Sequence, residues 1–358
     1  MTRNRNIDVF RAAALLLVML YHCWVLTGSK MLISPVVTNF IALGGEIGVT
    51  AFFVLSGFGI FLAIDKTTER GNFKYFSFLK RRFYRIAPQY YLCLLVVVLI
   101  SDAQYFSGYG IKMIISHLFF VHNLFPDCSG TINGALWTMG VTVQFYIIAP
   151  LLYKIFKKWS HLALLSSILF TIAMKTFLFS ILLPYLGKSG HLEFFIGRQL
   201  FSALDNFCIG MYAAVLIKEK KFKIERMQAW IISILFTILL FIISNLGIRY
   251  GVNTNNWSGY IWHSCCAVIL GGIMFGISYL KAYDKVWLYK KFIQLSHYEY
   301  GIYVWHLLII RNLIDRSAWV QTGINLGYAQ WLYIPLLTAA ILTGVVFTRL
   351  SDRKAAVP

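Results

Sequence analysis

The amino-acid sequence predicts an all-α, polytopic integral membrane protein with about ten transmembrane helices and both chain ends on the cytoplasmic side. Three observations support this prediction. The 358 residues are 59% hydrophobic and only 13% charged, whereas soluble domains carry about 25% charged residues. Apolar runs of about 20 residues, long enough to cross a bilayer, recur along the whole chain. Successive loops alternate between rich and poor in Lys and Arg, as the positive-inside rule requires.

The predicted spans fall near residues 7–28, 38–64, 84–101, 135–156, 161–184, 200–217, 229–248, 260–280, 296–316 and 331–350. Of the 33 Lys and Arg residues, 25 fall at the chain ends and in loops that this count places on one side. Because cytoplasmic loops carry the basic excess, that side is predicted to be cytoplasmic. The apolar segment 111–125 is too short to span, so we expect an interfacial or re-entrant helix on the outer side.

Composition also excludes several classes of protein. A net charge of +19 suggests nucleic-acid binding in a soluble domain, but here the charges lie in short loops, so no nucleic-acid partner is expected. The six cysteines form neither a CxxC pair nor a Cys/His zinc pattern, so no metal site is expected. Residues 1–358 are predicted to form a single transmembrane domain, inserted as a multi-pass protein in the plasma (inner) membrane.

The first predicted span carries two cationic side chains at different depths. Ten residues separate Arg11 from His22, and eleven helical steps of about 100° bring both to one face, about 16 Å apart along the axis. Polar groups at such depth usually line a protein interior or a pathway. The alternative is that Arg11 snorkels to the interface as an anchor and that His22 is a hydrogen-bonded core residue.

A pair of arginines stands at the start of the third predicted span, in F-L-K-R-R-F-Y-R-I-A-P. Arg82 and Arg85 lie within one helical turn. Paired arginines suit bidentate recognition of phosphate. The positive-inside rule alone also places arginines at this position, so both interpretations stay open.

Two further segments combine polar and small residues. Glu46 lies in G-G-E-I-G-V-T-A-F-F-V-L-S-G-F, whose glycines allow close helix contacts. The Glu46 carboxylate could pair with a cation, hold a substrate hydroxyl or cap its span. Trp137, Gln144 and Tyr146 in L-W-T-M-G-V-T-V-Q-F-Y could stack on a sugar or an acyl group. Interfacial aromatics beside a packed glutamine are the alternative.

Acidic residues occur inside two later spans. Asp205, which follows Arg198, is an intramembrane acid of the kind that usually has a function. Glu299, Tyr303 and His306 stand at positions i, i+4 and i+7 of one helical face in S-H-Y-E-Y-G-I-Y-V-W-H. Lys175 and His263 are expected to be lone polar groups satisfied by neighbours, with no functional role.

Together these motifs resemble the membrane acyltransferase-3 family. The resemblance rests on the Arg-x10-His of the first span, G-V-T-A-F-F-V-L-S-G-F, Arg-x-x-Arg before I-A-P, L-W-T-M…Q-F-Y-I-I-A-P-L-L and S-x-x-x-Y-G-I-Y-V-W-H, in that order over nearly the whole chain. It implies a ten-helix enzyme that passes an acyl group, usually acetyl, from cytoplasmic acyl-coenzyme A to a hydroxyl of a carbohydrate or envelope glycan. Arg11 and His22 match the family's paired functional residues, and Arg82 and Arg85 its arginine pair.

The chemistry of coenzyme A agrees with these assignments. A polyphosphate on a long thin arm suits a basic mouth with a polar line running inward, so Arg82, Arg85 and Arg11 are expected to bind acyl-coenzyme A as co-substrate, without a permanently bound cofactor. His22, with Arg11 and Glu46, is expected to carry the chemistry, since a neutral imidazole can accept the attacking hydroxyl's proton. The expected acceptor-binding residues are Trp137, Gln144, Tyr146, Arg198, Asp205, Glu299, Tyr303 and His306.

The sequence departs from the family at one position. The family commonly has a glutamate where Thr142 stands, and a hydroxyl cannot replace a carboxylate as base, so Glu46, Asp205 or Glu299 would have to supply an acid. Many relatives also carry an extracytoplasmic esterase-like domain after the last span, and none is expected here. A transporter of a polysaccharide, lipid-linked sugar or small metabolite is the rival function, because intramembrane charges also mark pathways. The sequence leaves the acceptor, the acyl chain length and homo-oligomer formation open.

Overall fold

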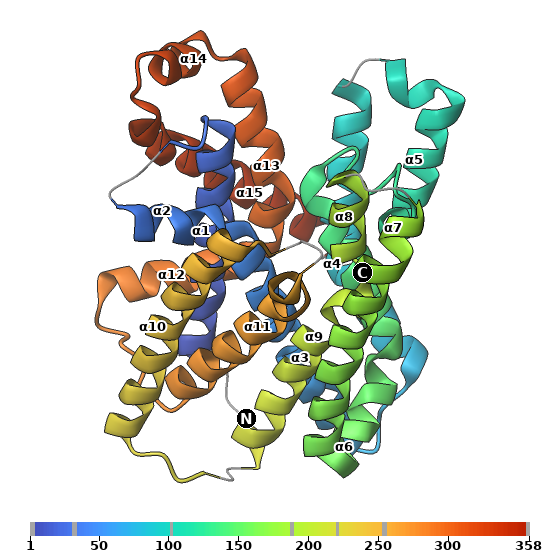
Figure 1. Ribbon diagram of the computed structural model, residues 1–358, viewed down its shortest axis with the longest axis vertical. Helices are drawn as coiled ribbons and strands as arrows, with labels where there is room; N and C mark the ends of the chain where they lie inside the picture. The colour runs from blue at the N-terminus through green and yellow to red at the C-terminus, as the bar shows by residue number, and fades with distance from the viewer. Residues whose placement is uncertain are drawn as a thin grey trace.

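The computed structural model describes residues 4–30, 34–100, 103–186, 190–219, 222–252 and 256–355. This part of the chain is almost entirely helical and contains no β-strand (Figure 1). Eight helical stretches within it are long and apolar enough to cross a membrane. The prediction of an all-α polytopic protein is therefore confirmed.

The long helices are α1 (Arg5–Leu26), α3 (Gly44–Glu69), α4 (Tyr75–Ile100), α6 (Trp137–Phe177), α9 (Leu200–Lys218), α10 (Arg226–Tyr250), α11 (Trp257–Ser278), α13 (Glu299–Arg316) and α15 (Tyr333–Ala355). Shorter helices lie between them: α2 (Pro35–Ala42), α5 (Gly108–Leu118), α7 (Leu183–Leu186), α8 (Gly190–Gly197), α12 (Trp287–His297) and α14 (Ala318–Asn325). Short helical turns cover Ala103–Phe106, His122–Leu124, Gly134–Leu136, Leu178–Leu182 and Ala329–Leu332.

Several predicted boundaries differ from the observed ones. The predicted span 38–64 is divided at Leu43 into α2 and α3, and α4 begins nine residues before the predicted start at residue 84, at Tyr75. The 18-residue α13 occupies the ninth predicted span but is too polar to be counted among the eight apolar stretches. Segment 111–125 contains most of the 11-residue α5, which is too short to cross a bilayer, and the 122–124 turn.

Two predicted spans lie on one 52-residue helical stretch, Gly134–Tyr185. The backbone of Trp159 is non-helical (φ −136°, ψ 57°) and divides α6. Before this kink, Lys157 binds Asp65 near the end of α3. After the kink, Lys175 contacts His263, which in turn contacts the first turn of α3. The chain therefore turns back at Trp159, and the stretch supplies two crossings.

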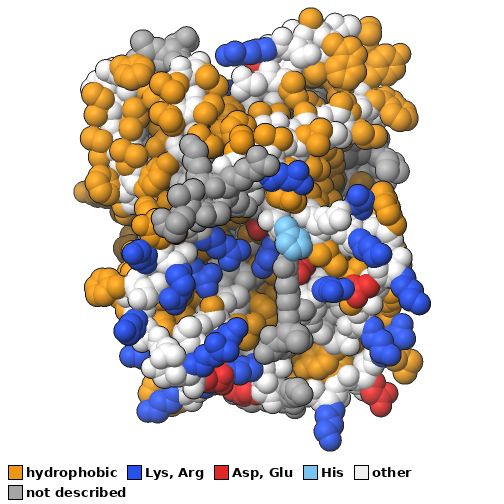
Figure 2. Space-filling model, turned by 180° about the vertical axis from the view of Figure 1, so that it is seen from behind, with side chains coloured by type: hydrophobic (Ala, Val, Ile, Leu, Met, Phe, Trp, Pro, Cys, Tyr) orange, Lys and Arg blue, Asp and Glu red, His pale blue; other side chains and the backbone are white. Residues whose placement is uncertain are grey.

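Basic side chains gather at one end of the molecule. In Figure 2 the Lys and Arg side chains cover mainly the lower half, and the upper half is largely hydrophobic. We call the lower end the basic end; it holds the end of α3, the beginning of α4 and the kink of α6. The opposite end holds α5, α14 and the segment 119–136 that leads into α6.

A buried aspartate ties three helices together at the basic end. Asp65 of α3 is 1% exposed and accepts hydrogen bonds from the Tyr153 hydroxyl (2.8 Å) and Lys157 (3.0 Å) of α6, and it also pairs with Lys218 of α9. A carboxylate held by three donors satisfies the requirement that buried charge be paired.

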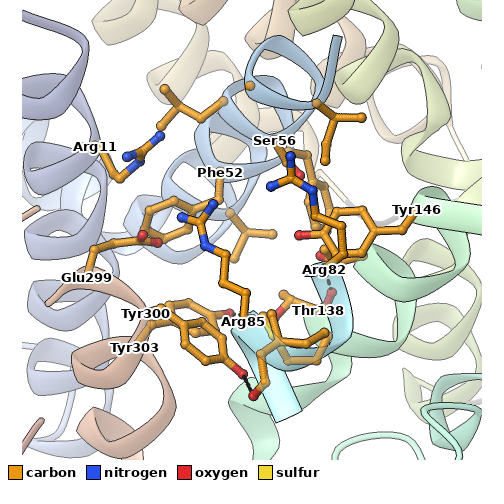
Figure 3. A pocket seen from close by; sticks show the side chains of 18 residues that line it. Arg11, Phe52, Ser56, Arg82, Arg85, Thr138, Tyr146, Glu299, Tyr300 and Tyr303 are labelled. Atoms are coloured by element: carbon orange, nitrogen blue, oxygen red, sulfur yellow. Dashed lines mark hydrogen bonds between the residues drawn. The ribbon is translucent and has the colours of Figure 1, made fainter. Parts of the chain in front are cut away.

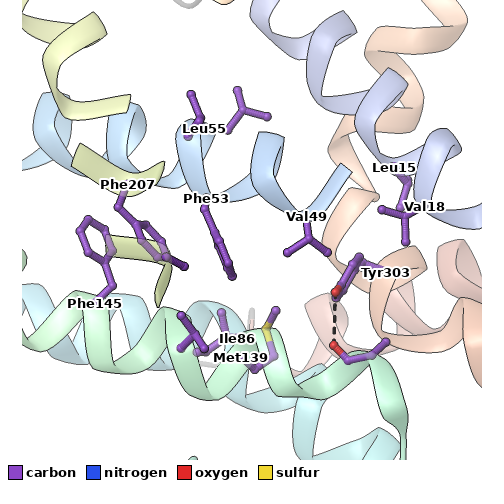
Figure 4. Close-up of a cluster of buried hydrophobic side chains, with 14 of the residues drawn as sticks. Leu15, Val18, Val49, Phe53, Leu55, Ile86, Met139, Phe145, Phe207 and Tyr303 are labelled. Atoms are coloured by element: carbon purple, nitrogen blue, oxygen red, sulfur yellow. Dashed lines mark hydrogen bonds between the residues drawn. The ribbon is translucent and has the colours of Figure 1, made fainter. Parts of the chain in front are cut away.

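Helix α3 runs through the centre and packs on α1, α6, α9 and α11. It crosses α9 closely enough that a Cβ at Gly57 would lie 1.9 Å from the Phe207 carbonyl oxygen, and one at Gly210 equally close to that of Val54. The phenyl rings of Phe53, Phe207 and Phe145 stack beside this crossing, with ring centroids 4.6 and 4.0 Å apart (Figure 4). The close crossing thus depends on glycine at both positions.

Candidate active site

A cavity lies toward the basic end between α1, α3, α4, α6 and α13 (Figure 3). Three arginines line it: Arg11 from α1, and Arg82 and Arg85 from successive turns of α4. Glu299, the first residue of α13, lines it as well. Hydroxyls also line this space of about 160 Å³, contributed by Ser56, Thr138, Thr142, Tyr146, Tyr300 and Tyr303. We call it the inner cavity.

A second cavity lies toward the opposite end and is roomier, at about 490 Å³. Its lining includes His22 of α1, Glu46 of α3 and Arg198, which precedes α9. Trp137 at the start of α6 and residues 129–131 also line it. We call it the outer cavity.

The two cavities meet at two shared side chains, Val49 and Tyr303. The Tyr303 hydroxyl donates to the Ala135 carbonyl (3.2 Å) and lies 3.0 Å from the Thr138 hydroxyl, while its ring meets Phe52 edge-on. Arg11 and His22, which share one helical face, therefore line different cavities on the two sides of this boundary. Val49 and Tyr303 thus form a short, partly polar partition between the inner and the outer cavity.

His22 forms a pair with His306. Its Nδ1 lies 2.9 Å from the Val18 carbonyl oxygen and 3.2 Å from Nε2 of His306, whose own Nδ1 lies 2.6 Å from the Tyr303 carbonyl oxygen. A carbonyl only accepts, so both Nδ1 atoms carry the proton and Nε2 of His306 accepts from His22. These hydrogen bonds assign the tautomer. Nε2 of half-buried His22 keeps its lone pair for a proton.

Glu46 is linked to two residues, His263 and Lys175, that were expected to have no functional role. Its Oε2 lies 3.0 Å from Nε2 of His263 on α11, and Nδ1 of His263 lies 3.2 Å from Nζ of Lys175 on α6. Lys175 is 2% exposed. Lys175 and His263 were expected to be lone polar groups satisfied by neighbours. They do have polar neighbours, but they are not isolated from each other, because Lys175 contacts His263 and His263 contacts Glu46. The only sequence feature pointing to them is a lysine within an apolar span.

Arg198 and Trp137 form one side of the outer cavity. The Arg198 guanidinium lies 4.6 Å from the centre of the Trp137 ring, a cation–π contact. Arg198 also interacts electrostatically with Glu46. The outer cavity thus offers an aromatic face, a guanidinium, a carboxylate and an imidazole to one ligand.

The position of the family's carboxylate falls in the inner cavity. Thr142 lines that cavity and its hydroxyl donates to the Thr138 carbonyl (2.7 Å). Glu299 lines the same cavity from α13 and interacts electrostatically with Arg11 and Arg85. Three acids could replace the carboxylate that the family has at Thr142. Of these, Glu299 lines the same inner cavity as Thr142, and Glu46 lines the outer cavity.

Three expected acceptor-binding residues line neither cavity. The Gln144 side chain donates to Oδ1 of Asn123 (2.9 Å), which fixes α6 to the 122–124 turn. Asp205 is fully buried in α9, where it interacts electrostatically with Lys175. His306 is also fully buried, and its Nε2 contacts Nδ1 of His22.

These observations define a class: a polytopic membrane protein with two polar cavities placed back to back, one rich in arginine and the other built on a histidine pair. A family model described as an acyltransferase domain matches residues 4–350. The chain belongs to this acyltransferase-3 family.

Three curated relatives match the chain. The peptidoglycan O-acetyltransferase OatA of Listeria monocytogenes is 26% identical over 331 residues, which are 85% of this chain and 49% of OatA. A protein of Acidianus two-tailed virus, provisionally named acetyltransferase ORF330, is 26% identical over 314 residues, 86% of this chain and 85% of its own. The regulator of hypoxia-inducible factor 1 of Caenorhabditis elegans is 29% identical over 185 residues, 43% of this chain and 34% of its own. The chain thus spans about half the length of OatA, and no solved structure matches it.

Proposed function

We propose that this protein is a membrane-bound O-acyltransferase that moves an acyl group, most simply acetyl, from cytoplasmic acyl-coenzyme A to a hydroxyl of an envelope or surface carbohydrate. The observation that carries this proposal is the pair of cavities that meet at Tyr303, one lined by three arginines and the other by His22. Membership of the acyltransferase family and the peptidoglycan O-acetyltransferase among its relatives support acyl transfer to a glycan.

The donor would bind from the basic end. Arg82 and Arg85 are the guanidinium groups best placed for the phosphates of coenzyme A, because bidentate, charge-assisted hydrogen bonds favour arginine at such sites. The narrow inner cavity would take the thin arm that carries the thioester. Its acyl end would pass Val49 and Tyr303 to reach His22.

The acceptor would occupy the outer cavity. Trp137 offers a face on which a sugar ring can stack, and Glu46 and Arg198 can accept from and donate to its hydroxyls. The larger volume of this cavity suits a carbohydrate better than the inner one does. Of the expected acceptor-binding residues, Trp137 and Arg198 remain in this proposal, with Tyr303 at the boundary, while Tyr146 and Glu299 line the inner cavity. Glu46, which was expected to take part in the chemistry, joins Trp137 and Arg198.

His22 would act as the general base. Its Nε2 takes the proton of the acceptor hydroxyl while the oxygen attacks the thioester carbonyl, so that the C–O bond forms and the C–S bond breaks. The proton then passes to the departing sulfur of coenzyme A. His306 holds Nδ1–H of His22 in place and stabilises the imidazolium that forms. Cys23 is fully buried and lines neither cavity, which favours direct transfer over an acyl-cysteine.

Purified protein in vesicles, given labelled acetyl-coenzyme A and soluble glycan fragments, tests the reaction. We expect label on the glycan with wild-type protein and none with His22→Ala of unchanged thermal stability. Glycan movement across the vesicle without consumption of donor would instead establish the transporter. Mass spectrometry of envelope glycans from cells with and without the protein identifies the acceptor and tests the proposed location in the plasma membrane.

A further inference from the structure

A line of three polar side chains leads from the outer cavity into the interior. Glu46 on α3, His263 on α11 and Lys175 on α6 are joined by contacts of 3.0 and 3.2 Å. The exposed fraction falls along the line, from 25% for the Glu46 side chain to 2% for Lys175. Residues from three separate helices thus converge behind a single carboxylate of the outer cavity.

Hydrogen-bond chemistry gives this line a direction. A lysine ammonium has donors only, so Nζ of Lys175 donates to Nδ1 of His263. A neutral imidazole whose Nδ1 accepts must carry its proton on Nε2, and Nε2–H then donates to Glu46. Glu46 is therefore the acceptor at the end of the line, which is the role of an ionised carboxylate.

The surrounding charges balance in this state. Lys175 interacts electrostatically with the buried Asp205, and Arg198 interacts with Glu46 from the other side. The two cations Lys175 and Arg198 thus offset the two anions Glu46 and Asp205, with a neutral His263 between them. Removing one member would leave an uncompensated charge inside the protein, which is strongly unfavourable.

We propose that Lys175 and His263 are positioning residues that keep Glu46 ionised and aimed at the outer cavity. The role in catalysis rests on the proposed function: an ionised Glu46 in the cavity of His22 stabilises the imidazolium that forms when His22 takes the acceptor's proton. Lys175 and His263 touch neither the donor nor the acceptor and act only through Glu46.

Infrared difference spectroscopy tests the charge state of Glu46 without any substrate. The carboxyl bands of Glu46 are assigned from the difference between wild type and Glu46→Gln. The groups that face Glu46 and have to be considered in the assignment are Tyr21, Lys175, Arg198, His263, Cys266 and Tyr303. At neutral pH we expect an ionised band in wild type and a protonated band in both His263→Leu and Lys175→Met.

Two variants make the test specific. His263→Gln keeps one donor and one acceptor in the line, so it should restore the ionised band that His263→Leu loses. His161→Leu removes a histidine of α6 that bonds Tyr212 and lines neither cavity, and it should leave the band unchanged. Thermal stability of each purified variant is measured alongside, and Lys175→Met carries the test should His263→Leu fail to fold.

Acyl transfer by the same variants tests the catalytic consequence. We expect His263→Leu and Lys175→Met to lower kcat on the order of 10- to 100-fold, as misplaced catalytic groups do, with little change in KM for the donor. An ionised Glu46 band in both variants, or a His263→Gln variant as impaired as His263→Leu, would overturn the proposal. A wild type that transfers no acyl group contradicts the proposed function instead, and leaves the infrared result standing.

Discussion

At the scale of single residues, the hydrogen bonds of His22 decide which of its nitrogens can accept a proton. Nδ1 is committed to the Val18 carbonyl and to His306, so Nε2 is the nitrogen left to act as the proposed base. A neutral imidazole here takes the orienting place that a carboxylate often fills in such pairs. The proposed base therefore does not depend on an acid at Thr142, which lines the other cavity.

Substitution of the two histidines should separate their roles. We expect His22→Ala to lower kcat on the order of 10²- to 10⁴-fold, because it removes the general base. His306→Leu should cost less, and His306→Gln, which retains an acceptor, should cost less still. Steady-state rates of labelled transfer measure these effects, and equal losses in the two His306 variants would contradict the orienting role.

The arginines of the inner cavity should govern donor binding. Arg82→Gln removes charge-assisted hydrogen bonds to phosphate, each worth roughly 1.5–3 kcal/mol, so KM for acetyl-coenzyme A should rise about 10- to 100-fold with kcat less affected. Lys158→Gln is the matched control, since Lys158 is a basic residue of the same end that does not line this cavity. A similar rise in both variants would mean that only the overall positive charge matters.

Sequence reasoning reached part of this site. Helical spacing placed Arg11 and His22 on one face, and the structure adds that Tyr303 divides that face between two cavities. His263 could not be assigned a partner from sequence, because Lys175 lies 88 positions away along the chain and the pairing depends on how α6 packs on α11. Gln144 was expected to bind substrate, whereas it bonds the loop residue Asn123.

At the scale of elements, the crossing of α3 and α9 sets the width of the core. We expect Gly57→Ala to lower the free energy of unfolding by about 1–3 kcal/mol, the usual effect of overpacking, because its methyl group would collide with the Phe207 carbonyl. Gly59→Ala, two residues along the same helix, has no atom within 4 Å of the added carbon. Thermal unfolding in detergent compares the two, and equal melting temperatures would contradict the close crossing.

A stacked pair of histidines, one near the end of α5 and one in the 122–124 turn, should respond to acid. The rings of His117 and His122 lie 3.9 Å apart, and burial lowers the pKa of His117 to about 4 and that of His122 to about 3. An opened segment has ordinary pKa values near about 6.5 and takes up protons first. The stabilising contribution of each histidine is therefore complete above that pH and is lost as the pH falls toward 4.

Hydrogen–deuterium exchange of residues 113–136 measures this loss. From about pH 7 to about pH 5, after correction for the intrinsic rate, protection should decrease by on the order of 1–2 kcal/mol per histidine. His117→Phe keeps a stacked ring that cannot titrate and should reduce the decrease. Equal protection at both pH values in the wild type would show that the two rings do not resist protonation.

Helix positions were predicted well where apolar length alone decides, as in α1, α9, α10 and α11. Predicted boundaries were wrong where polar residues extend a helix beyond the bilayer, as at the start of α4. The sequence predicted a break between the spans 135–156 and 161–184, but not the helical geometry that continues through Trp159. Such continuity depends on packing against α3 and α9 rather than on hydropathy.

At the scale of the whole molecule, the arrangement of charge matches the arrangement of the two cavities. The arginine-lined cavity lies toward the end that carries most Lys and Arg (Figure 2), and the cavity of His22 lies toward the other. Because cytoplasmic loops carry the basic excess, donor and acceptor are expected to approach from opposite sides. The partition at Val49 and Tyr303 then keeps the two ligands apart except at the reacting atoms.

Oriented vesicles test this central claim most directly. Labelled acetyl-coenzyme A is supplied only at the basic end of the protein, and soluble glycan only at the opposite face, with wild type, His22→Ala and Arg82→Gln compared. Two-sided transfer predicts labelled glycan on the opposite face for wild type, little for Arg82→Gln and none for His22→Ala. Label appearing only when donor and glycan share one face, or glycan crossing the membrane with the donor intact, would contradict it.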